Sequence, residues 1–260
     1  MTEASKPGGD WPLPFWIAHR GAGKLAPENT LAAFRLGARH GYRAFECDVK
    51  LSADGIPFLL HDATLERTSN GRGTAGERPW AELAQLDACH HRRYPITDVA
   101  ESDWPVQEGV PTLAAVLEVL RDFHHLQLEV KARREEDVAV VVRRLPELWR
   151  PFGQRAITTS FHAEYLRRIR LAAPEIPRGL LIETDHGGDP VREAVELGCI
   201  SLGPHYSLCT PELVQQAHAA GLKVSPWTVN SDTDLLAMRD LGVDSAITDV
   251  PRRALALLGG

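Results

Sequence analysis

The sequence of 260 residues is 43% hydrophobic and 25% charged, which is ordinary for a folded globular protein and argues against wholesale disorder or a fibrous repeat. Its 29 basic and 35 acidic residues give a formal net charge of −6, which argues against a broad electrostatic surface for nucleic acid or anionic membranes. No apolar stretch approaches the roughly 20 residues that a membrane span requires, and the N-terminus lacks the apolar segment of a signal peptide. We therefore expect a cytoplasmic protein with no nucleic-acid partner and no stable membrane association.

Short apolar runs alternate with amphipathic helical patterns from about residue 16 to the end of the chain. The expected strands are 16–19, 44–50, 126–131, 156–160, 179–183, 199–203, 223–229 and 245–248. The expected helices are 30–40, 112–123, 135–149, 162–172, 190–197, 211–220, 232–241 and 251–258. This alternation predicts an α/β fold, a (β/α)8 TIM barrel formed as a single domain by 15–260, after a flexible lead-in of 1–14. A doubly wound open sheet is the alternative, but the sequence has no GxGxxG or P-loop pattern to support it.

One stretch interrupts the alternation after the second expected strand. Asp54-Gly55 lies between two apolar runs, which predicts a hairpin whose returning strand is 56–61. If these two residues form the loop, Ala53 pairs with Ile56 and His61 lies opposite Asp48. Residues 62–111 then contain only one short helical pattern, near 80–87, and are too long for an ordinary barrel loop. We expect them to form a small insertion on the catalytic rim.

Acidic side chains gather on two neighbouring strands of the predicted barrel. Glu46 and Asp48 are two residues apart on one strand, so both point to the same face, and Glu129 and Lys131 repeat this spacing on the next. Three carboxylates in one barrel mouth repel one another unless positive charge compensates them. Ligands that are all oxygen favour a hard divalent cation over zinc, with Mg²⁺ placed first and Ca²⁺ second. A buried ion-pair network without a metal is the alternative reading.

Basic residues of three kinds follow the same strand ends. His19 and His61 come from separate segments and are expected to face each other across the metal, where one can act as an acid and the other as a base. Arg20 offers a fork of donors that suits a phosphate oxygen. Together with Lys131 and the carboxylates, these residues predict phosphoryl chemistry.

At these residues the sequence resembles the glycerophosphodiester phosphodiesterase family, in its bacterial cytosolic type. The motifs, in chain order, are His19-Arg20-Gly21, Pro27-Glu28-Asn29-Thr30, Glu46-Cys47-Asp48-Val49, His61-Asp62 with Leu65, Arg67-Thr68 and Asn70-Gly71, Glu129-Val130-Lys131, Ser160-Phe161, Trp227-Thr228-Val229-Asn230, and Ile247-Thr248-Asp249 with Pro251. The triplet His19-Arg20-Gly21 alone is weak evidence for the family, but the ordered set of motifs is specific for it. The resemblance extends over roughly residues 16 to 252. The segment 89–109 matches least.

The resemblance implies a TIM barrel and an enzyme that hydrolyses glycerophosphodiesters to sn-glycerol 3-phosphate and an alcohol. It implies one divalent cation held by Glu46, Asp48 and Glu129, and an acid–base pair formed by His19 and His61. It also implies that the substrate's own glycerol 2-hydroxyl attacks first, to give a cyclic phosphate that water then opens. The resemblance leaves open which histidine is the acid.

The resemblance further implies contacts to a small-molecule substrate. The implied substrate-binding residues are Arg20 and Lys131 for the phosphate, and Phe161 and Trp227 as apolar walls near the glycerol or alcohol group. Glu28 and Asn29 are expected to support the site from behind. The alternatives are phospholipase-D-like cleavage of lysophospholipids, a catalytically silent barrel that binds phosphate, and a metal-dependent sugar isomerase. The sequence leaves the preferred alcohol and the oligomeric state open.

Overall fold

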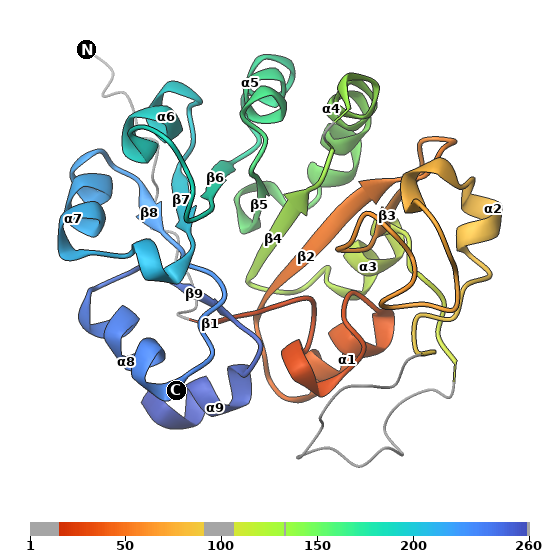
Figure 1. The fold of residues 1–260 in the computed structure, drawn as a ribbon, viewed down its shortest axis with the longest axis horizontal. Coiled ribbons are helices and arrows are strands. Elements are labelled where there is room, and N and C mark those ends of the chain that lie inside the picture. Colours follow the sequence, from red (N-terminus) through yellow and green to blue (C-terminus); the bar gives the residue numbers. More distant parts are fainter. Residues whose placement is uncertain (1–15, 91–106, 133, 259–260) are drawn as a thin grey trace.

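The computed structural model describes residues 16–90, 107–132 and 134–258, and the predicted lead-in 1–14 lies outside them. Eight parallel strands form the central ring that Figure 1 shows. They are β1 (Trp16–Ala18), β2 (Ala44–Leu51), β4 (His125–Val130), β5 (Ala156–Ser160), β6 (Arg178–Ile182), β7 (Ser201–Pro204), β8 (Lys223–Val224) and β9 (Ala246–Thr248). Adjacent strands pair in the order β8-β7-β6-β5-β4-β2-β1-β9.

Backbone hydrogen bonds close this sheet into a ring. The N–H of Val229 donates to the Ile247 carbonyl, and the N–H of Ile247 donates to the Pro226 carbonyl, both at 2.9 Å. These bonds join the chain after β8 to β9. The structure therefore confirms the predicted TIM barrel and excludes the open sheet. The regular part of β8 ends at Val224, short of the expected 223–229, and Pro226 has no N–H to extend the ladder.

Helices surround the ring and alternate with its strands (Figure 1). They are α1 (Leu31–Arg39), α3 (Leu113–Val119), α4 (Glu135–Trp149), α5 (Ala163–Ala172), α6 (Pro190–Glu196), α7 (Pro211–Ala219), α8 (Asp232–Asp240) and α9 (Pro251–Leu258). Hydroxyl side chains begin several of them: Thr30, Thr112, Thr210 and Ser231 each accept a hydrogen bond from the backbone N–H three residues on. Among the described residues, no helix is long and apolar enough to cross a membrane.

The alternation of side chains along β2 places the acidic residues inside the ring. Phe45 and Cys47 are fully buried in the hydrophobic core with residues of the surrounding helices, whereas Glu46 and Asp48 point the other way. The parallel register sets Asp48 beside Glu129 of β4. The pairing of β2 with β4 therefore brings carboxylates from distant parts of the chain together.

The hairpin after β2 forms, but its register differs from the expected one. Strand β3 (Pro57–Leu59) pairs with β2 through Val49 opposite Leu59, so Leu60 lies beside Asp48 and donates its N–H to the Asp48 carbonyl. The loop has three residues because Gly55 adopts φ 75° and donates its N–H to the Ser52 carbonyl, the usual form of a three-residue hairpin loop. The expectation that His61 lies opposite Asp48 in the ladder was wrong.

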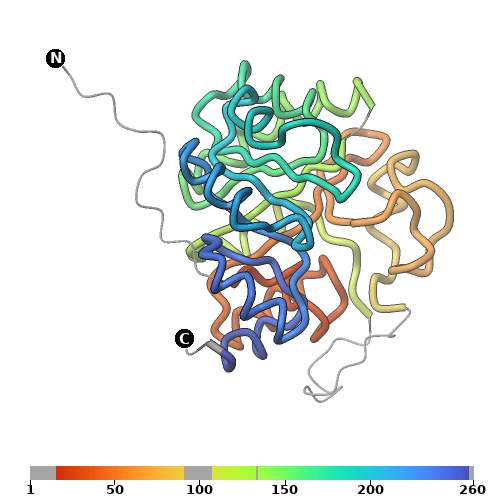
Figure 2. The backbone as a smooth tube through the Cα atoms, turned by 60° about the vertical axis from the view of Figure 1, so that its left-hand side comes forward, coloured from red at the N-terminus to blue at the C-terminus, as the bar shows by residue number. Residues whose placement is uncertain are grey.

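The segment after the hairpin extends from one side of the barrel, as Figure 2 shows. It contains the short helix α2 (Trp80–Leu83), and its buried Leu65 and Leu83 form a small apolar cluster with Phe58 of β3. Residues on this segment line the cavity described below, as the predicted insertion on the catalytic rim requires. Most of the segment 89–109 lies outside the described residues.

Candidate active site

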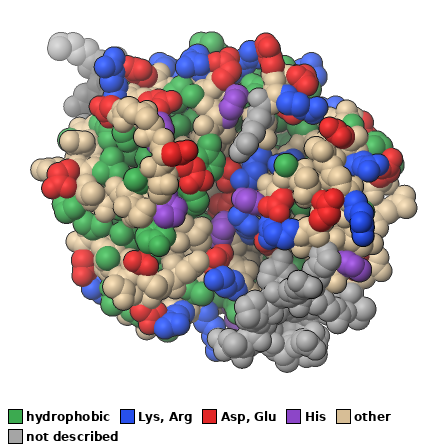
Figure 3. Space-filling model, viewed as in Figure 1, with side chains coloured by type: hydrophobic (Ala, Val, Ile, Leu, Met, Phe, Trp, Pro, Cys, Tyr) green, Lys and Arg blue, Asp and Glu red, His purple; other side chains and the backbone are tan. Residues whose placement is uncertain are grey.

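A cavity of about 680 Å³ opens at the carboxyl ends of the barrel strands. In the space-filling view, histidine, acidic and basic side chains gather in the hollow at the middle of the face (Figure 3). The predicted site residues that line the cavity are His19, Arg20, Glu46, His61, Glu129, Lys131, Phe161 and Trp227. Asp48 and Glu28 do not line it, but each contacts Arg20, which does. Asn29 contacts Asp48. The structure thus brings all the predicted site residues together.

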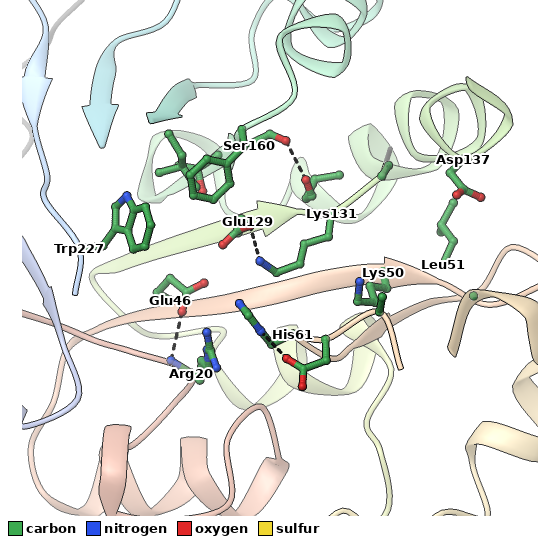
Figure 4. A pocket seen from close by; sticks show the side chains of 18 of the residues that line it. Arg20, Glu46, Lys50, Leu51, His61, Glu129, Lys131, Asp137, Ser160 and Trp227 are labelled. Atoms are coloured by element: carbon green, nitrogen blue, oxygen red, sulfur yellow. Dashed lines mark hydrogen bonds and ion pairs between the residues drawn. The ribbon is translucent and has the colours of Figure 1, made fainter. Parts of the chain in front are cut away.

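Three carboxylates form the centre of the site. One oxygen from each of Glu46, Asp48 and Glu129 lies within 4.8 Å of the others. Figure 4 shows Glu46 and Glu129 gathered with Lys131 between Trp227 on one side and Lys50 on the other. Glu46 and Asp48 are almost completely buried. Such a group of like charges in a buried place costs free energy unless positive charge is close by.

The pKa shifts of these carboxyls follow from burial and mutual repulsion. Burial, followed by the charges of Asp48 and Glu129, raises the pKa of Glu46 well above its usual value. Burial is also the largest cause that raises the pKa of Glu129 to about 7. Asp48 shifts the other way: burial opposes ionisation, but Arg20 and Lys131 outweigh it and hold the pKa well below its usual value. The centre therefore has more acidic groups than its neighbouring cations fully compensate.

These three carboxylates fit a divalent cation. Glu46 Oε1 is buried and accepts no hydrogen bond from the part of the chain that the structure describes. A cation at the shared position would give this oxygen a partner and would offset the repulsion that raises the pKa values of Glu46 and Glu129. The donors are all oxygen, which suits Mg²⁺ or Ca²⁺.

Two basic side chains flank the carboxylates. Lys131 forms ion pairs with Glu129 and with Asp48 Oδ1, the second at 3.1 Å. Arg20 Nε lies 3.1 Å from Asp48 Oδ2, and its Nη1 donates to Glu28 Oε1 at 2.8 Å. Arg20 has φ 53°, which is unusual for a residue with a side chain, and its backbone N–H donates to Glu46 Oε2 at 3.1 Å. The first loop is therefore tied to the acidic centre through both its backbone and its side chain.

His19 is oriented by the end of the last strand. Its Nδ1 lies 2.6 Å from Asp249 Oδ1, and its Nε2 lies 3.8 Å from Glu46 Oε2. Asn230 donates to the other oxygen of Asp249 at 2.9 Å. Burial opposes ionisation of Asp249, but the bond to His19 outweighs it, and the pKa is lowered to about 2. An ionised carboxylate can only accept, so His19 Nδ1 donates and Nε2 is directed to the acidic centre.

His61 also lines the cavity and has a similar partner. Its Nδ1 lies 2.7 Å from Asp62 Oδ1. The ring is about one third exposed and lines the cavity, and burial is the largest cause that lowers its pKa. Both histidines therefore have an aspartate at Nδ1, which leaves Nε2 of each for contacts within the cavity.

The remaining wall of the cavity is aromatic. Phe161 follows β5 and packs edge-on against Trp227, with ring centroids 5.3 Å apart. Trp227 Nε1 donates to the Gly203 carbonyl at 2.9 Å, which fixes its ring over β7. Phe161 stays 36% exposed, although most large apolar side chains in the described residues are buried. An exposed ring at the cavity edge is available for contact with a bound molecule.

Sequence reasoning gave no role to the residues that orient the histidines. Asp62, Arg67, Asn230 and Asp249 occur in the motifs, but a motif does not say which side chains touch. For Asp249 the signal was present, because it follows the eighth strand, and a closed barrel places that strand beside the first.

The fold and the site lead to a known family. The model of the glycerophosphoryl diester phosphodiesterase family matches residues 19–253. The chain belongs to this family. A glycerophosphodiester phosphodiesterase from Caldanaerobacter subterraneus subsp. tengcongensis is 33% identical, with 93% of this chain and 96% of that protein covered. Family membership confirms the prediction of an enzyme, a phosphodiesterase of the hydrolase class.

Solved structures agree with this assignment. The crystal structure of a protein from Silicibacter pomeroyi superposes on this chain with a TM-score of 0.84 at 27% sequence identity. The superposition covers 96% of this chain and 95% of that protein's chain. A phosphodiesterase from Oleispira antarctica, solved in complex with the product sn-glycerol-3-phosphate, has a TM-score of 0.81 at 31% identity. That comparison covers 95% of this chain and 97% of the other.

Proposed function

We propose that this glycerophosphodiester phosphodiesterase requires a divalent cation and hydrolyses small deacylated diesters to sn-glycerol 3-phosphate and an alcohol. The observation that carries the proposal is the group of three carboxylates within 4.8 Å, flanked by two cations and two histidines around one cavity. The Oleispira relative, which is 31% identical, holds sn-glycerol-3-phosphate as its product. This supports the same product here.

We assign the cation to Glu46, Asp48 and Glu129, with Mg²⁺ placed before Ca²⁺. When bound, it supplies positive charge that polarises the phosphoryl group. Arg20 and Lys131 border the same centre and contact the phosphate oxygens, which offsets the charge that grows in the transition state. Binding of a phosphate would loosen their present ion pairs with Asp48, since both kinds of oxygen compete for the same donors.

His19 and His61 transfer the protons of the reaction. One Nε2 accepts the proton of the attacking hydroxyl, and the other histidine gives a proton to the alkoxide that leaves phosphorus. The attacking group is the substrate's glycerol 2-hydroxyl, and water then opens the resulting cyclic phosphate. Asp249 and Asp62 keep both rings oriented for this exchange. Phe161 and Trp227 pack against the apolar edge of the substrate, and Glu28 and Asn29 hold Arg20 and Asp48 in place.

A panel of substrates tests the proposal. The purified protein is incubated with glycerophosphocholine, glycerophosphoethanolamine and lysophosphatidylcholine, and glycerol 3-phosphate and free alcohol are measured. Release of glycerol 3-phosphate from the two deacylated diesters supports it. Activity on the lysolipid alone would show phospholipase-D-like cleavage instead, and binding without turnover would show a silent barrel. A cytoplasmic location without stable membrane association stays a prediction of the sequence.

A further inference from the structure

Arg67 links two parts of the catalytic rim from outside the cavity. It lies in the segment after β3, and its guanidinium contacts two carboxylates at once. Nε and Nη2 donate to Asp62 at 2.5 and 3.0 Å, while Nη1 and Nη2 donate to Glu28 at 2.8 and 2.7 Å. Paired contacts of this kind fix the plane of a carboxylate as well as its position.

The Asp62 carboxylate carries this constraint to His61. Asp62 Oδ1 accepts from Arg67 and also lies 2.7 Å from His61 Nδ1. The bond from Arg67 is the largest cause that lowers the pKa of Asp62 to about 2, so the carboxylate is ionised and can only accept. His61 Nδ1 therefore donates, and the lone pair of the neutral ring is on Nε2. Without Arg67 the carboxylate could turn away, and the ring would lose the partner that selects this tautomer.

His19 does not depend on a comparable arginine. Its aspartate, Asp249, is held by Asn230, whose Nδ2 donates to Asp249 Oδ2 and whose Oδ1 accepts a hydrogen bond from the backbone N–H of Asp249. His61 follows the short strand β3, where no regular element holds its aspartate. The two histidines thus have similar partners but different supports.

We propose that Arg67 is a positioning residue for the reaction: it holds the Asp62 carboxylate and, through it, sets the orientation and tautomer of His61. This inference rests on the proposed function, in which His61 transfers a proton. A lysine cannot replace Arg67 fully, since its single ammonium cannot form the paired contacts to both carboxylates.

The test compares Arg67→Ala, Arg67→Lys and Asp62→Asn with a matched control. Arg78 lies in the same segment and has the same side-chain exposure of 46%. It pairs with Glu82, and neither residue lines the cavity. We expect Arg67→Ala to lower kcat for glycerophosphocholine about tenfold or more, Arg67→Lys to fall between it and wild type, and Arg78→Ala to match wild type. In the Asp62→Asn background, Arg67→Ala should cause less loss than it does alone, since both changes break the connection to His61 and only the contacts of Arg67 with Glu28 remain to be lost.

The ¹⁵N shifts of His61 give a readout that simple destabilisation would not move. At a pH where the ring is neutral, folded wild-type protein should show Nδ1 protonated, and folded Arg67→Ala should show a mixture of tautomers. Wild-type kcat in Arg67→Ala, additive losses with Asp62→Asn, or an unchanged tautomer would each overturn the inference. If His61→Ala itself stays active, the proposed acid–base role of His61 fails; if only Arg67→Ala stays active, the inference about Arg67 alone fails.

Discussion

Asn29 and Asp48 form two reciprocal hydrogen bonds. Asn29 Nδ2 donates to Asp48 Oδ2 at 2.7 Å, and the backbone N–H of Asp48 donates to Asn29 Oδ1 at 3.2 Å. Asn29 has φ 58°, a conformation that asparagine tolerates better than most residues. One side chain thus fixes both the backbone and the carboxylate of a residue that we assign to the metal.

Loss of this side chain should weaken metal binding. We expect Asn29→Ala to reduce Mg²⁺ affinity by about 10- to 100-fold, the usual cost of removing a group that orients a ligand. Asn29→Gly removes the same amide but suits the positive φ, so it separates the side-chain effect from backbone strain. Isothermal titration calorimetry checks both variants. Wild-type affinity in Asn29→Gly would show that the amide is not what orients Asp48.

The two histidines should be needed for turnover but not for metal binding. We expect His19→Ala and His61→Ala each to lower kcat by about 10²- to 10⁴-fold, because each removes a proton donor or acceptor. Mg²⁺ affinity should change little, as neither ring is among the assigned ligands. His124→Ala, at an exposed position away from the cavity, is the control. A near-wild-type rate in either site variant would end the acid–base assignment for that histidine.

Metal affinity should rise with pH through neutrality. Burial raises the pKa of Glu129 to about 7, so near pH 6 this carboxyl is largely protonated in the metal-free protein, and a cation must displace the proton. In the absence of metal, the protonated Glu129 carboxyl stabilises the folded state at pH values below its pKa in the unfolded chain. This contribution is lost as pH rises through about 7. Calorimetry of Mg²⁺ binding at several pH values, in buffers of different ionisation enthalpy, should detect the released proton. Affinity independent of pH with no proton release would contradict this account.

His125 should contribute to acid sensitivity outside the active site. It is the first residue of β4 and almost fully buried, and burial lowers its pKa to about 3. Its neutral form contributes stability above about pH 6.5 that is lost as pH falls towards 3, at up to about 1.4 kcal/mol per pH unit. Urea unfolding between pH 7 and 4.5 should therefore show a shallower loss in His125→Gln than in wild type. The exposed neighbour gives the control: His124→Gln should keep the wild-type slope, and equal slopes in all three proteins would refute the prediction.

Sequence patterns predicted the barrel because each strand and helix is encoded locally. The acidic centre was predictable for the same reason, since the spacing of Glu46 and Asp48 fixes their shared face. The hairpin register was not, because a three-residue loop around Gly55 and a two-residue loop have nearly the same sequence signal.

The partners of the histidines depend on tertiary structure. His19 and Asp249 are 230 positions apart and meet only because the last strand closes the barrel against the first. Asp62 is adjacent to His61 in sequence, but its carboxylate is oriented by Arg67, whose side-chain direction no local pattern fixes. Sequence therefore located the histidines that we assign to proton transfer better than the residues that hold them in place.

The most direct test of the account is the metal requirement of glycerophosphocholine hydrolysis. Wild-type protein is treated with EDTA, passed into metal-free buffer, and assayed for glycerol 3-phosphate release without metal and after addition of Mg²⁺ or Ca²⁺. The arrangement of Glu46, Asp48 and Glu129 predicts loss of activity on chelation and its return with the cation. A full rate in the chelated protein would contradict the assignment of these carboxylates to a catalytic metal.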